Sequence, residues 1–279
     1  MPSTEFQLGT KKINRIGFGA IHLCGPRAWG PPADPAGAVA VLRRAVELGV
    51  NFIDTADSYG PGSNEELIAE ALHPYPDGLI VATKAGQSRP SQAEWRPLGR
   101  PEYLRQQVEL SLRRLKIERI DLFQLHRIDP LVPADEQFGV LARMREEGKI
   151  DQVGLSEVTV EEIEAARRQV DVAAVQNLYN LADRKYEDVL AHCAAEGIAF
   201  IPWRPIARGE LAASSDVRLG AIARRTGVTP AQVALAWLLH RAPVVVPIPG
   251  TASLDHLAEN VAAAKLELDD DQLAELDAS

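Results

Sequence analysis

The sequence predicts an α/β protein that folds as a (β/α)8 TIM barrel with an N-terminal β-hairpin and extra C-terminal helices. Short apolar runs alternate along the chain with longer segments in which apolar residues recur every three to four positions. That alternation is typical of repeated parallel βα units. Eight such runs can be identified, which is the number that closes a barrel of parallel strands.

The predicted strands are short runs of apolar and β-branched residues. Before the first of them, the stretch FQLGTKKI has the pattern of a small hairpin, which we expect to plug the barrel floor. The eight predicted strands are RIGFG (15–19), NFID (51–54), LIVATK (79–84), IDLFQLH (120–126), IDQVGLS (150–156), VAAVQ (172–176), IAFIPW (198–203) and VVVPI (244–248).

The segments between these strands have helical periodicity and suitable boundary residues. Asp34 before Pro35 suits an N-cap followed by a first-turn proline, and Gly49, Gly148 and Gly197 stand where helices should end. The predicted helices are 35–48, 63–72, 101–115, 133–147, 159–169, 185–196 and 216–240, the last broken near Gly227 to Pro230, with 254–264 and 270–277 as terminal helices.

A doubly wound open sheet is the main alternative to the barrel. Such a fold normally carries a G-x-G-x-x-G turn after its first strand, and RIGFGAIHLCG does not follow that pattern. The length of 279 residues exceeds the usual size of one domain, but α/β barrels routinely reach it as a single unit. We therefore expect residues 1–279 to form one barrel domain.

Charge and composition favour a small-molecule partner over nucleic acid or a membrane. The formal net charge is −9, whereas phosphate backbones are bound through excess Lys and Arg. The longest apolar stretches, such as VALAWLL at 233–239, are far shorter than the roughly 18 residues of a membrane span. The first residues contain no signal-peptide core. With only two cysteines, the composition favours a reducing, cytoplasmic setting.

In a barrel, functional side chains gather at the carboxyl ends of the strands, where the βα loops form the open face. Each polar residue found there has an ordinary structural explanation when taken alone, such as a turn cap, a solvated charge or a core histidine. Together they would converge on one pocket. They are Asp54, Lys84, His126, Ser156, Gln176 and Trp203, with Tyr59 in the loop after the second strand.

Four of these residues suit the protonation of a carbonyl group. A phenol has an ordinary pKa of about 10, and a nearby Lys84 ammonium would stabilise the Tyr59 phenolate and lower that pKa. Asp54 supplies the counter-charge that keeps a buried Lys84 protonated. A neutral His126 would donate an N–H to the carbonyl oxygen, where negative charge develops.

Hydride transfer requires a nicotinamide or a flavin, because no side chain supplies a hydride. Ser156 and Gln176 can hydrogen-bond a carboxamide, and Trp203 can stack on a nicotinamide ring. Gln176 ends an apolar strand, where a buried amide needs a partner.

Across nearly its whole length the chain resembles the aldo-keto reductases. The motifs that carry the resemblance are GVNFIDTADSYG, VATKAG with its lysine, IDLFQLH, VAAVQNLYN and PGTASLDHLAEN, in that order. The resemblance implies a barrel that binds NADPH without a Rossmann domain and reduces an aldehyde or ketone. It also implies a catalytic tetrad of Asp54, Tyr59, Lys84 and His126.

The resemblance further implies which residues hold the cofactor. Ser156 and Gln176 would bind the carboxamide, residues 204–209 would wrap the pyrophosphate, and the turn before residue 254 would present amides to the 2′-phosphate. Glu259 and Asn260 would lie at the adenine. The implied cofactor-binding residues are Gly19, Ala20, Ile21, Asp54, Ser156, Gln176, Trp203, Arg204, Pro205, Ile206, Arg208, Gly209, Pro249, Gly250, Thr251, Ser253, His256, Glu259 and Asn260.

Some residues depart from the family's pattern. Glu157 follows Ser156 where the family often has Asn. Trp203 stands where tyrosine is usual, which keeps the stacking surface and removes the hydroxyl. Gly250 and His256 stand where lysine and arginine occur in NADPH-specific members, so NADH remains open as a cofactor.

Loops on the open face set substrate specificity in barrels. Here they contain Trp29, Trp95, Tyr103 and Arg127, which would line an aromatic pocket with a basic edge, or else pack the loops. The run of motifs is similar to bacterial members that include pyridoxal reductases. These observations lead to the hypothesis of an aromatic aldehyde substrate such as pyridoxal.

Two other functions remain open from the sequence. A metal-dependent barrel hydrolase would use Asp54, Asp57 and His126, but no second histidine lies at a strand end to complete the usual roughly three or four ligands, so we expect no metal. A cofactor-binding regulatory subunit without turnover would share the fold, although the intact tetrad argues against it.

Overall fold

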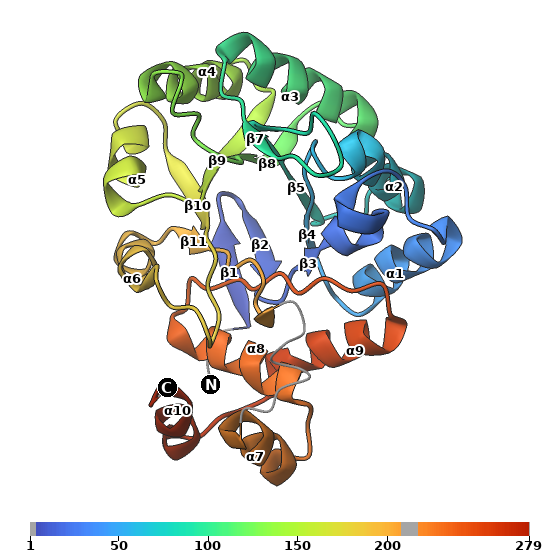
Figure 1. The fold of residues 1–279 in the computed structure, drawn as a ribbon, viewed down its shortest axis with the longest axis vertical. Coiled ribbons are helices and arrows are strands. Elements are labelled where there is room, and N and C mark those ends of the chain that lie inside the picture. Colours follow the sequence, from blue (N-terminus) through green and yellow to red (C-terminus); the bar gives the residue numbers. More distant parts are fainter. Residues whose placement is uncertain (1–3, 208–216, 279) are drawn as a thin grey trace.

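The computed structural model describes residues 4–207 and 217–278. Its helices form an outer ring around the parallel strands, and the hairpin of β1 and β2 lies across the middle of that ring in Figure 1. The strands are β1 (Glu5–Leu8), β2 (Lys11–Asn14), β3 (Phe18–Gly19), β4 (Phe52–Asp54), β5 (Ile80–Ala85), β6 (Gln87–Ser88), β7 (Arg96–Pro97), β8 (Ile120–Leu125), β9 (Ile150–Ser156), β10 (Val172–Gln176) and β11 (Ala199–Phe200). The α-helices are α1 (Pro35–Glu47), α2 (Ser63–Leu72), α3 (Pro101–Leu115), α4 (Ala134–Glu146), α5 (Val160–Arg167), α6 (Glu187–Glu196), α7 (Val217–Thr226), α8 (Pro230–Arg241), α9 (Leu254–Ala262) and α10 (Asp270–Asp277).

Seven strands form one sheet in the order β11-β10-β9-β8-β5-β4-β3, and every neighbouring pair is parallel. This order follows the chain, because each strand pairs with the strand of the preceding βα unit. All of the strands therefore point their carboxyl ends toward the same face of the molecule.

The predicted eighth strand, residues 244–248, runs between β11 and β3 and bonds to both sides. Phe200 N donates to Val244 O at 2.9 Å. Gly17 N donates to Pro247 O at 3.0 Å. Pro247 carries no N–H to donate in return, which makes the ladder on this side irregular. The barrel is closed by these bonds, although this last segment is not a regular strand.

The β1–β2 hairpin closes the amino end of the barrel, as the sequence predicts. Lys11 Nζ donates to Asp121 Oδ1 at 2.6 Å, at the start of β8. Asn14 N donates to Asn51 Oδ1 at 2.7 Å, just before β4. Above these polar contacts lies an apolar interior cluster of Leu8, Ile13, Phe52, Ile80, Ala82, Leu122, Ala174, Ala199, Ile201, Val246 and Ile248. The carboxyl end is left for polar groups.

Helix boundaries also follow the predicted chemistry. The Asp34 side chain accepts from Gly37 N at 2.9 Å and so caps α1. The segment predicted at 216–240 divides into α7 and α8, and Thr229 and Gln232 form a capping box at the start of α8. The predicted barrel with its hairpin and terminal helices is confirmed, and the β6–β7 hairpin is an addition that no sequence pattern indicates. Within the described parts of the chain, no helix combines the length and apolar character that crossing a bilayer requires.

Candidate active site

Polar side chains from neighbouring strands meet at the carboxyl end of the barrel. Asp54 ends β4, and Lys84 lies in β5, where the register pairs it with Gln124 of β8. Ser156 and Gln176 end β9 and β10 and are paired with each other. All five side chains are buried. Adjacent parallel strands therefore bring predicted catalytic and cofactor residues to one place.

The Asp54 carboxylate is the centre of a buried hydrogen-bond network. Lys84 Nζ donates to its Oδ2 at 2.6 Å. The side-chain amides of Gln124 and Gln176 donate to its Oδ1 at 3.0 and 2.8 Å. Both oxygens are thus satisfied, as a buried carboxylate requires. The partner that the buried Gln176 amide needs is therefore Asp54.

Lys84 is fully buried and faces three oxygen atoms. Besides Asp54 Oδ2, its Nζ donates to Thr55 O at 2.8 Å and to the Tyr59 hydroxyl oxygen at 3.4 Å. Burial acts to lower the pKa of Lys84, but the charges and hydrogen bonds of Asp54 and Tyr59 raise it above its ordinary value. Lys84 therefore stays protonated at neutral pH.

The Tyr59 phenol does not have the lowered pKa that the sequence leads one to expect. Burial raises the pKa of Tyr59 by more than the Lys84 charge lowers it, and the Asp54 charge adds to the rise. The expected effect of Lys84 is present but is the smaller one. The expected lowering of the Tyr59 pKa is therefore wrong, and the phenol is protonated at neutral pH.

His126 lies beside Tyr59, with the two ring centroids 5.9 Å apart. Burial, and then the charges of Lys84 and Arg127, lower the pKa of His126 well below its ordinary value. The imidazole is therefore neutral at pH 7 and carries one N–H. Its Nδ1 lies 3.3 Å from Ser58 Oγ. A Ser58 hydroxyl that donates to Nδ1 leaves the N–H on Nε2.

Asp57 is a second buried acid, and it faces the helical layer. Its Oδ1 finds no hydrogen bond of normal geometry among the described residues, while the Tyr103 hydroxyl donates to Oδ2 over 3.4 Å. Burial, and then the negative charge of Glu65, raise the pKa of Asp57 well above its ordinary value. Tyr103 therefore packs in the layer between α3 and the barrel. This is the alternative to lining an aromatic pocket.

Two residues of this network, Gln124 and Ser58, are absent from the sequence-based prediction. Gln124 has a readable signal, because it is an amide in an apolar strand, two positions before His126 and thus on the same face. Ser58 has none, since serine is ordinary in a loop before a glycine.

The predicted cofactor segments 19–21 and 249–251 lie against each other beside this network. Gly19 N donates to Pro249 O at 3.4 Å. A Cβ on Gly250 would meet Gly19 O at 2.3 Å, which is closer than any real contact. Only glycine fits there, so the backbones of these two segments form a surface without intervening side chains.

The residues predicted to contact the nicotinamide lie at the ends of successive strands or shortly after them. Ser156 Oγ accepts from Arg127 Nη1 at 3.1 Å. The Trp203 indole N–H donates to Glu157 Oε1 at 2.7 Å. The guanidinium carbon of Arg204 lies 4.6 Å from the centroid of the Trp203 ring.

Only part of the predicted pyrophosphate loop, residues 204–209, can be described. Pro205 is buried, and Ile206 packs against the main core. Arg204 and Ala207 both have positive φ, at 53° and 47°. Arg208 and Gly209 lie outside the described residues, so their predicted role stays a prediction.

The predicted phosphate turn leads directly into α9. Ser253 N donates to Thr251 Oγ1 at 3.0 Å, and Ser253 Oγ accepts from His256 N at 3.3 Å, which caps the helix. The His256 side chain is exposed, that of Glu259 is partly buried, and Asn260 is buried. The turn thus presents the positive end of a capped helix.

Of the predicted substrate residues, Trp95 contacts the site directly. Its ring lies edge-on to those of Tyr59 and His126, with centroids 6.4 and 6.3 Å away. The Arg89 guanidinium carbon lies 3.7 Å from the centroid of Trp95 and 5.3 Å from that of Trp29. Trp29 is therefore connected to the site through Arg89.

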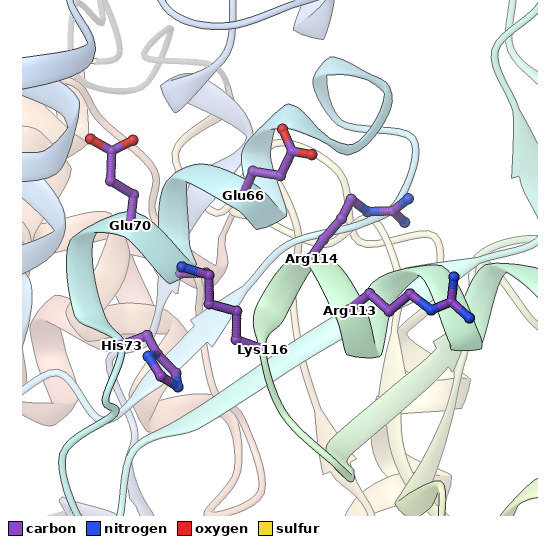
Figure 2. A pocket seen from close by; sticks show the side chains of 7 residues that line it. Glu66, Glu70, His73, Arg113, Arg114 and Lys116 are labelled. Carbon is purple, nitrogen blue, oxygen red and sulfur yellow. The ribbon is translucent and has the colours of Figure 1, made fainter.

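A separate groove lies on the outside of the barrel between α2 and α3 (Figure 2). Its walls carry charges of both signs, and it shares no residue with the network at the strand ends. The groove is lined by Glu66, Ala69, Glu70, His73, Arg113, Arg114 and Lys116.

Comparisons with known proteins agree with this arrangement. The Aldo/keto reductase family profile matches residues 15–279. An uncharacterised oxidoreductase of Schizosaccharomyces pombe is 50% identical over 271 residues, which cover 97% of this chain and 88% of the relative. Pyridoxine 4-dehydrogenase of Escherichia coli is 42% identical over 283 residues, covering 99% and 98%. The crystal structure of an aldo-keto reductase from Klebsiella pneumoniae in complex with NADPH is 30% identical, covers 100% of this chain and 95% of that one, and superposes with a TM-score of 0.84. With the match spanning nearly the whole chain, this protein belongs to the aldo/keto reductase family.

Proposed function

We propose that this protein reduces an aldehyde or ketone to an alcohol with NADPH as the hydride donor, and that Tyr59 delivers the proton. The observation that carries the proposal is the buried contact of Lys84 with both Asp54 and Tyr59, at 2.6 and 3.4 Å. Family membership and the relative crystallised with NADPH support the choice of cofactor.

The side chains at the strand ends suit a nicotinamide nucleotide. Ser156 Oγ and Gln176 Oε1 are hydrogen-bonding atoms for a carboxamide, and Trp203 offers an aromatic surface. The tight contact of Gly19 with Gly250 lets a ligand approach the backbone, and the start of α9 suits a phosphate. When bound, the nicotinamide supplies the hydride that the carbonyl carbon accepts.

The carbonyl oxygen then requires a proton, which the Tyr59 hydroxyl holds. Its raised pKa keeps the phenol protonated before the reaction. The neutral His126 donates its N–H to the same oxygen as negative charge develops there. As the O–H bond of Tyr59 breaks and that of the alcohol forms, the Lys84 ammonium stabilises the phenolate that is left.

A metal-dependent hydrolase is the poorer explanation of the same residues. The Lys84 ammonium lies at Asp54 Oδ2, and two amides saturate Oδ1, so the carboxylate already has its cationic partner. In residues 4–207 and 217–278, no three His, Cys, Asp or Glu side chains are grouped closely enough to hold a metal ion.

For the substrate we infer an aromatic aldehyde such as pyridoxal. Trp95 places an aromatic ring beside Tyr59 and His126, and Arg127 adds a positive charge next to Ser156. The relative named pyridoxine 4-dehydrogenase, 42% identical, supports the same chemistry.

Both cysteines are free thiols, which supports the expected reducing, cytoplasmic setting.

Tyr59→Phe tests proton delivery. Removing the hydroxyl should lower kcat by about 10² to 10⁴-fold, the contribution of a positioned general acid. The Kd for NADPH, measured by calorimetry, should change by less than about threefold, because the interaction is used only in the transition state. Tyr75→Phe is the control, since its hydroxyl bonds Leu115 O on the outer layer. Equal losses of binding and turnover in Tyr59→Phe would contradict the assigned role, and wild-type binding of NADPH without turnover of any carbonyl would indicate a regulatory subunit.

Substrate and cofactor preference are tested by NADPH and NADH oxidation at 340 nm. Pyridoxal should be reduced with a higher kcat/KM than aliphatic aldehydes of similar size. Turnover of aliphatic aldehydes alone would remove the aromatic substrate while leaving the carbonyl reductase in place. Gly250 and His256 stand where lysine and arginine occur in NADPH-specific members. The ratio of the affinities for NADPH and NADH therefore measures how well the turn before α9 recognises the 2′-phosphate.

A further inference from the structure

Glu157 holds an unusual backbone conformation to place its carboxylate. It follows β9 directly and has φ of 57°, in the left-handed region that is disfavoured for glutamate. Its side chain is 15% exposed, so the carboxylate is largely removed from water. A residue held in such a conformation at a strand end is more often tied to function than one in a regular element.

The Glu157 carboxylate accepts hydrogen bonds from residues that follow the next two strands. Its Oε1 accepts from Leu178 N at 2.6 Å, after β10, and from Trp203 Nε1 at 2.7 Å, after β11. Its Oε2 lies 3.3 Å from the Tyr186 hydroxyl. The lengths to Oε1 are those of charge-assisted bonds. One side chain therefore connects three successive βα junctions at the open end of the barrel.

These bonds fix the orientation of the Trp203 ring. The indole N–H is held at its edge by Glu157, and the Arg204 guanidinium lies 4.6 Å from the ring centroid. A flat ligand can then stack on the face opposite Arg204 only. Oε1 already accepts two short hydrogen bonds, and Oε2 lies between the Tyr186 hydroxyl and Lys185 Nζ, at 3.3 and 3.9 Å.

We infer that Glu157 is a positioning residue that locks Trp203 in place to stack on the nicotinamide ring. This inference rests on the proposed function. The two departures from the family pattern, Glu157 for Asn and Trp203 for tyrosine, are thereby one hydrogen-bonded unit. The indole N–H needs an acceptor, and a glutamate side chain is long enough to supply it.

Glu157→Asn is the decisive single substitution. Asparagine adopts positive φ more readily than glutamate, so the backbone is relieved of strain, but the side chain is one methylene too short to reach Trp203. The Kd for NADPH should rise by about tenfold, the value of one lost charge-assisted hydrogen bond. Glu157→Gln keeps the reach and should restore most of the affinity. Glu161→Gln removes a charge from the exposed start of α5 and should have no effect.

A double-mutant cycle with Trp203→Phe isolates the pair. Phenylalanine keeps an aromatic face and removes the N–H, so Trp203→Phe should also weaken NADPH by about tenfold. The double variant Glu157→Asn/Trp203→Phe should be no weaker than Glu157→Asn alone, because the bond that Trp203→Phe removes is already lost there. If the two losses of NADPH affinity multiplied in the double variant, the inference would be overturned. An unchanged Kd in Glu157→Asn would overturn it as well.

A measurement on the protein without cofactor tests the contact between Glu157 and Trp203 separately from the proposed function. In the ¹H–¹⁵N spectrum of the protein alone, the indole N–H signal that Trp203→Phe removes should shift and lose protection from exchange in Glu157→Asn. An unmoved signal would refute the contact itself. A wild-type protein that binds neither NADPH nor NADH would overturn the proposed function, and the stacking role with it. Normal wild-type binding with normal binding by Glu157→Asn would overturn the stacking role alone.

Discussion

Arg15 and Lys84 are cations buried at opposite ends of the same barrel, and their partners differ in kind. Arg15 is 1% exposed and precedes β3 at the amino end. Lys84 is 0% exposed, lies at the carboxyl end, and is bound to the Asp54 carboxylate and the Tyr59 phenol. Arg15 donates to three carbonyl oxygens near the end of α8, those of Leu239, Ala242 and Val245.

The difference in partners changes how burial acts on the pKa of each cation. Burial lowers the pKa of Arg15 to about 10, so it stays charged and satisfies carbonyls that the end of α8 leaves unpaired. The pKa of Lys84 is raised instead, because its partners carry charge and can exchange protons. Burial alone therefore identifies neither site. A reaction site is indicated when the partner of the buried charge is itself titratable.

Backbone strain is distributed in the same unequal way. Among the described residues, six that are not glycine have positive φ. Lys116 ends α3, and the others lie in loops that follow strand ends at the open face: Arg27, Ala28, Glu157, Arg204 and Ala207. The carboxyl end of the barrel thus carries five of these six conformations, and the amino end carries the one that ends α3.

Lys84→Met should have the largest effect. The loss of the ammonium leaves the Tyr59 phenolate without a counter-charge and should lower kcat by about 10³-fold. It also leaves Asp54 buried and unpaired, which should cost about 3 kcal/mol of unfolding free energy at pH 7. Steady-state kinetics and urea unfolding measure the two effects.

The double variant Lys84→Met/Asp54→Asn is the control for misfolding. It removes both charges and should recover most of the stability, while kcat stays as low as in Lys84→Met. Recovery of turnover together with stability would show that Lys84 acts only on the fold and would make it equivalent to Arg15.

Arg15→Met should have the opposite profile. It leaves several buried carbonyls without their donor and should lower the unfolding free energy by about 3 kcal/mol. The kcat should change by less than about twofold, since the carbonyls that Arg15 bonds among the described residues lie at the opposite end of the barrel from the site. Arg43→Met, which removes a single bond to Ala71 O in the outer layer, should cost only about 1 kcal/mol. A large loss of kcat in soluble, folded Arg15→Met would contradict the separation of the two ends.

The fold was predictable because its signals are local or general. Apolar runs and helical periodicity identify the strands and helices, and parallel strands must share one open face. The last strand was predictable only as an extended segment, because Pro247 disrupts its ladder. Arg15 was not predictable as a buried residue, since nothing in the sequence distinguishes it from an exposed arginine before a strand.

The site was predictable as a set of strand-end residues and not as a set of contacts. Asp54 and Lys84 meet because β4 and β5 are neighbours. The contact of Glu157 with Trp203 joins residues 46 positions apart, and no spacing rule links them. The sign of the Lys84 effect on the Tyr59 pKa followed from charge alone, but the net direction depended on burial, which only the structure gives.

His126→Gln should alter how stability depends on pH. The folded pKa of His126 lies well below its ordinary value, so between the two values the unfolded chain binds a proton that the folded protein does not. Stability is therefore complete above about pH 6.5 and falls as the pH drops, by up to about 1.4 kcal/mol per unit from this group. His126→Gln should flatten that slope between pH 6.5 and 5, measured by urea unfolding. His256→Gln, on the exposed start of α9, is the matched control, and a slope as steep as the wild type in His126→Gln would contradict the assignment.

Ser58→Ala should have the smallest effect and tests the tautomer of His126. With the Ser58 hydroxyl 3.3 Å from Nδ1, donation to that nitrogen keeps the N–H on Nε2, where it can meet a carbonyl oxygen. Without the hydroxyl the ring samples both tautomers, so kcat should fall by about threefold while the Kd for NADPH is unchanged. Ser63→Ala removes a buried hydroxyl that has no partner among the described residues and should leave kcat as it is. If both substitutions lowered kcat equally, Ser58 would act through packing, and the neutral His126 would hold its tautomer without help from the loop that carries Tyr59.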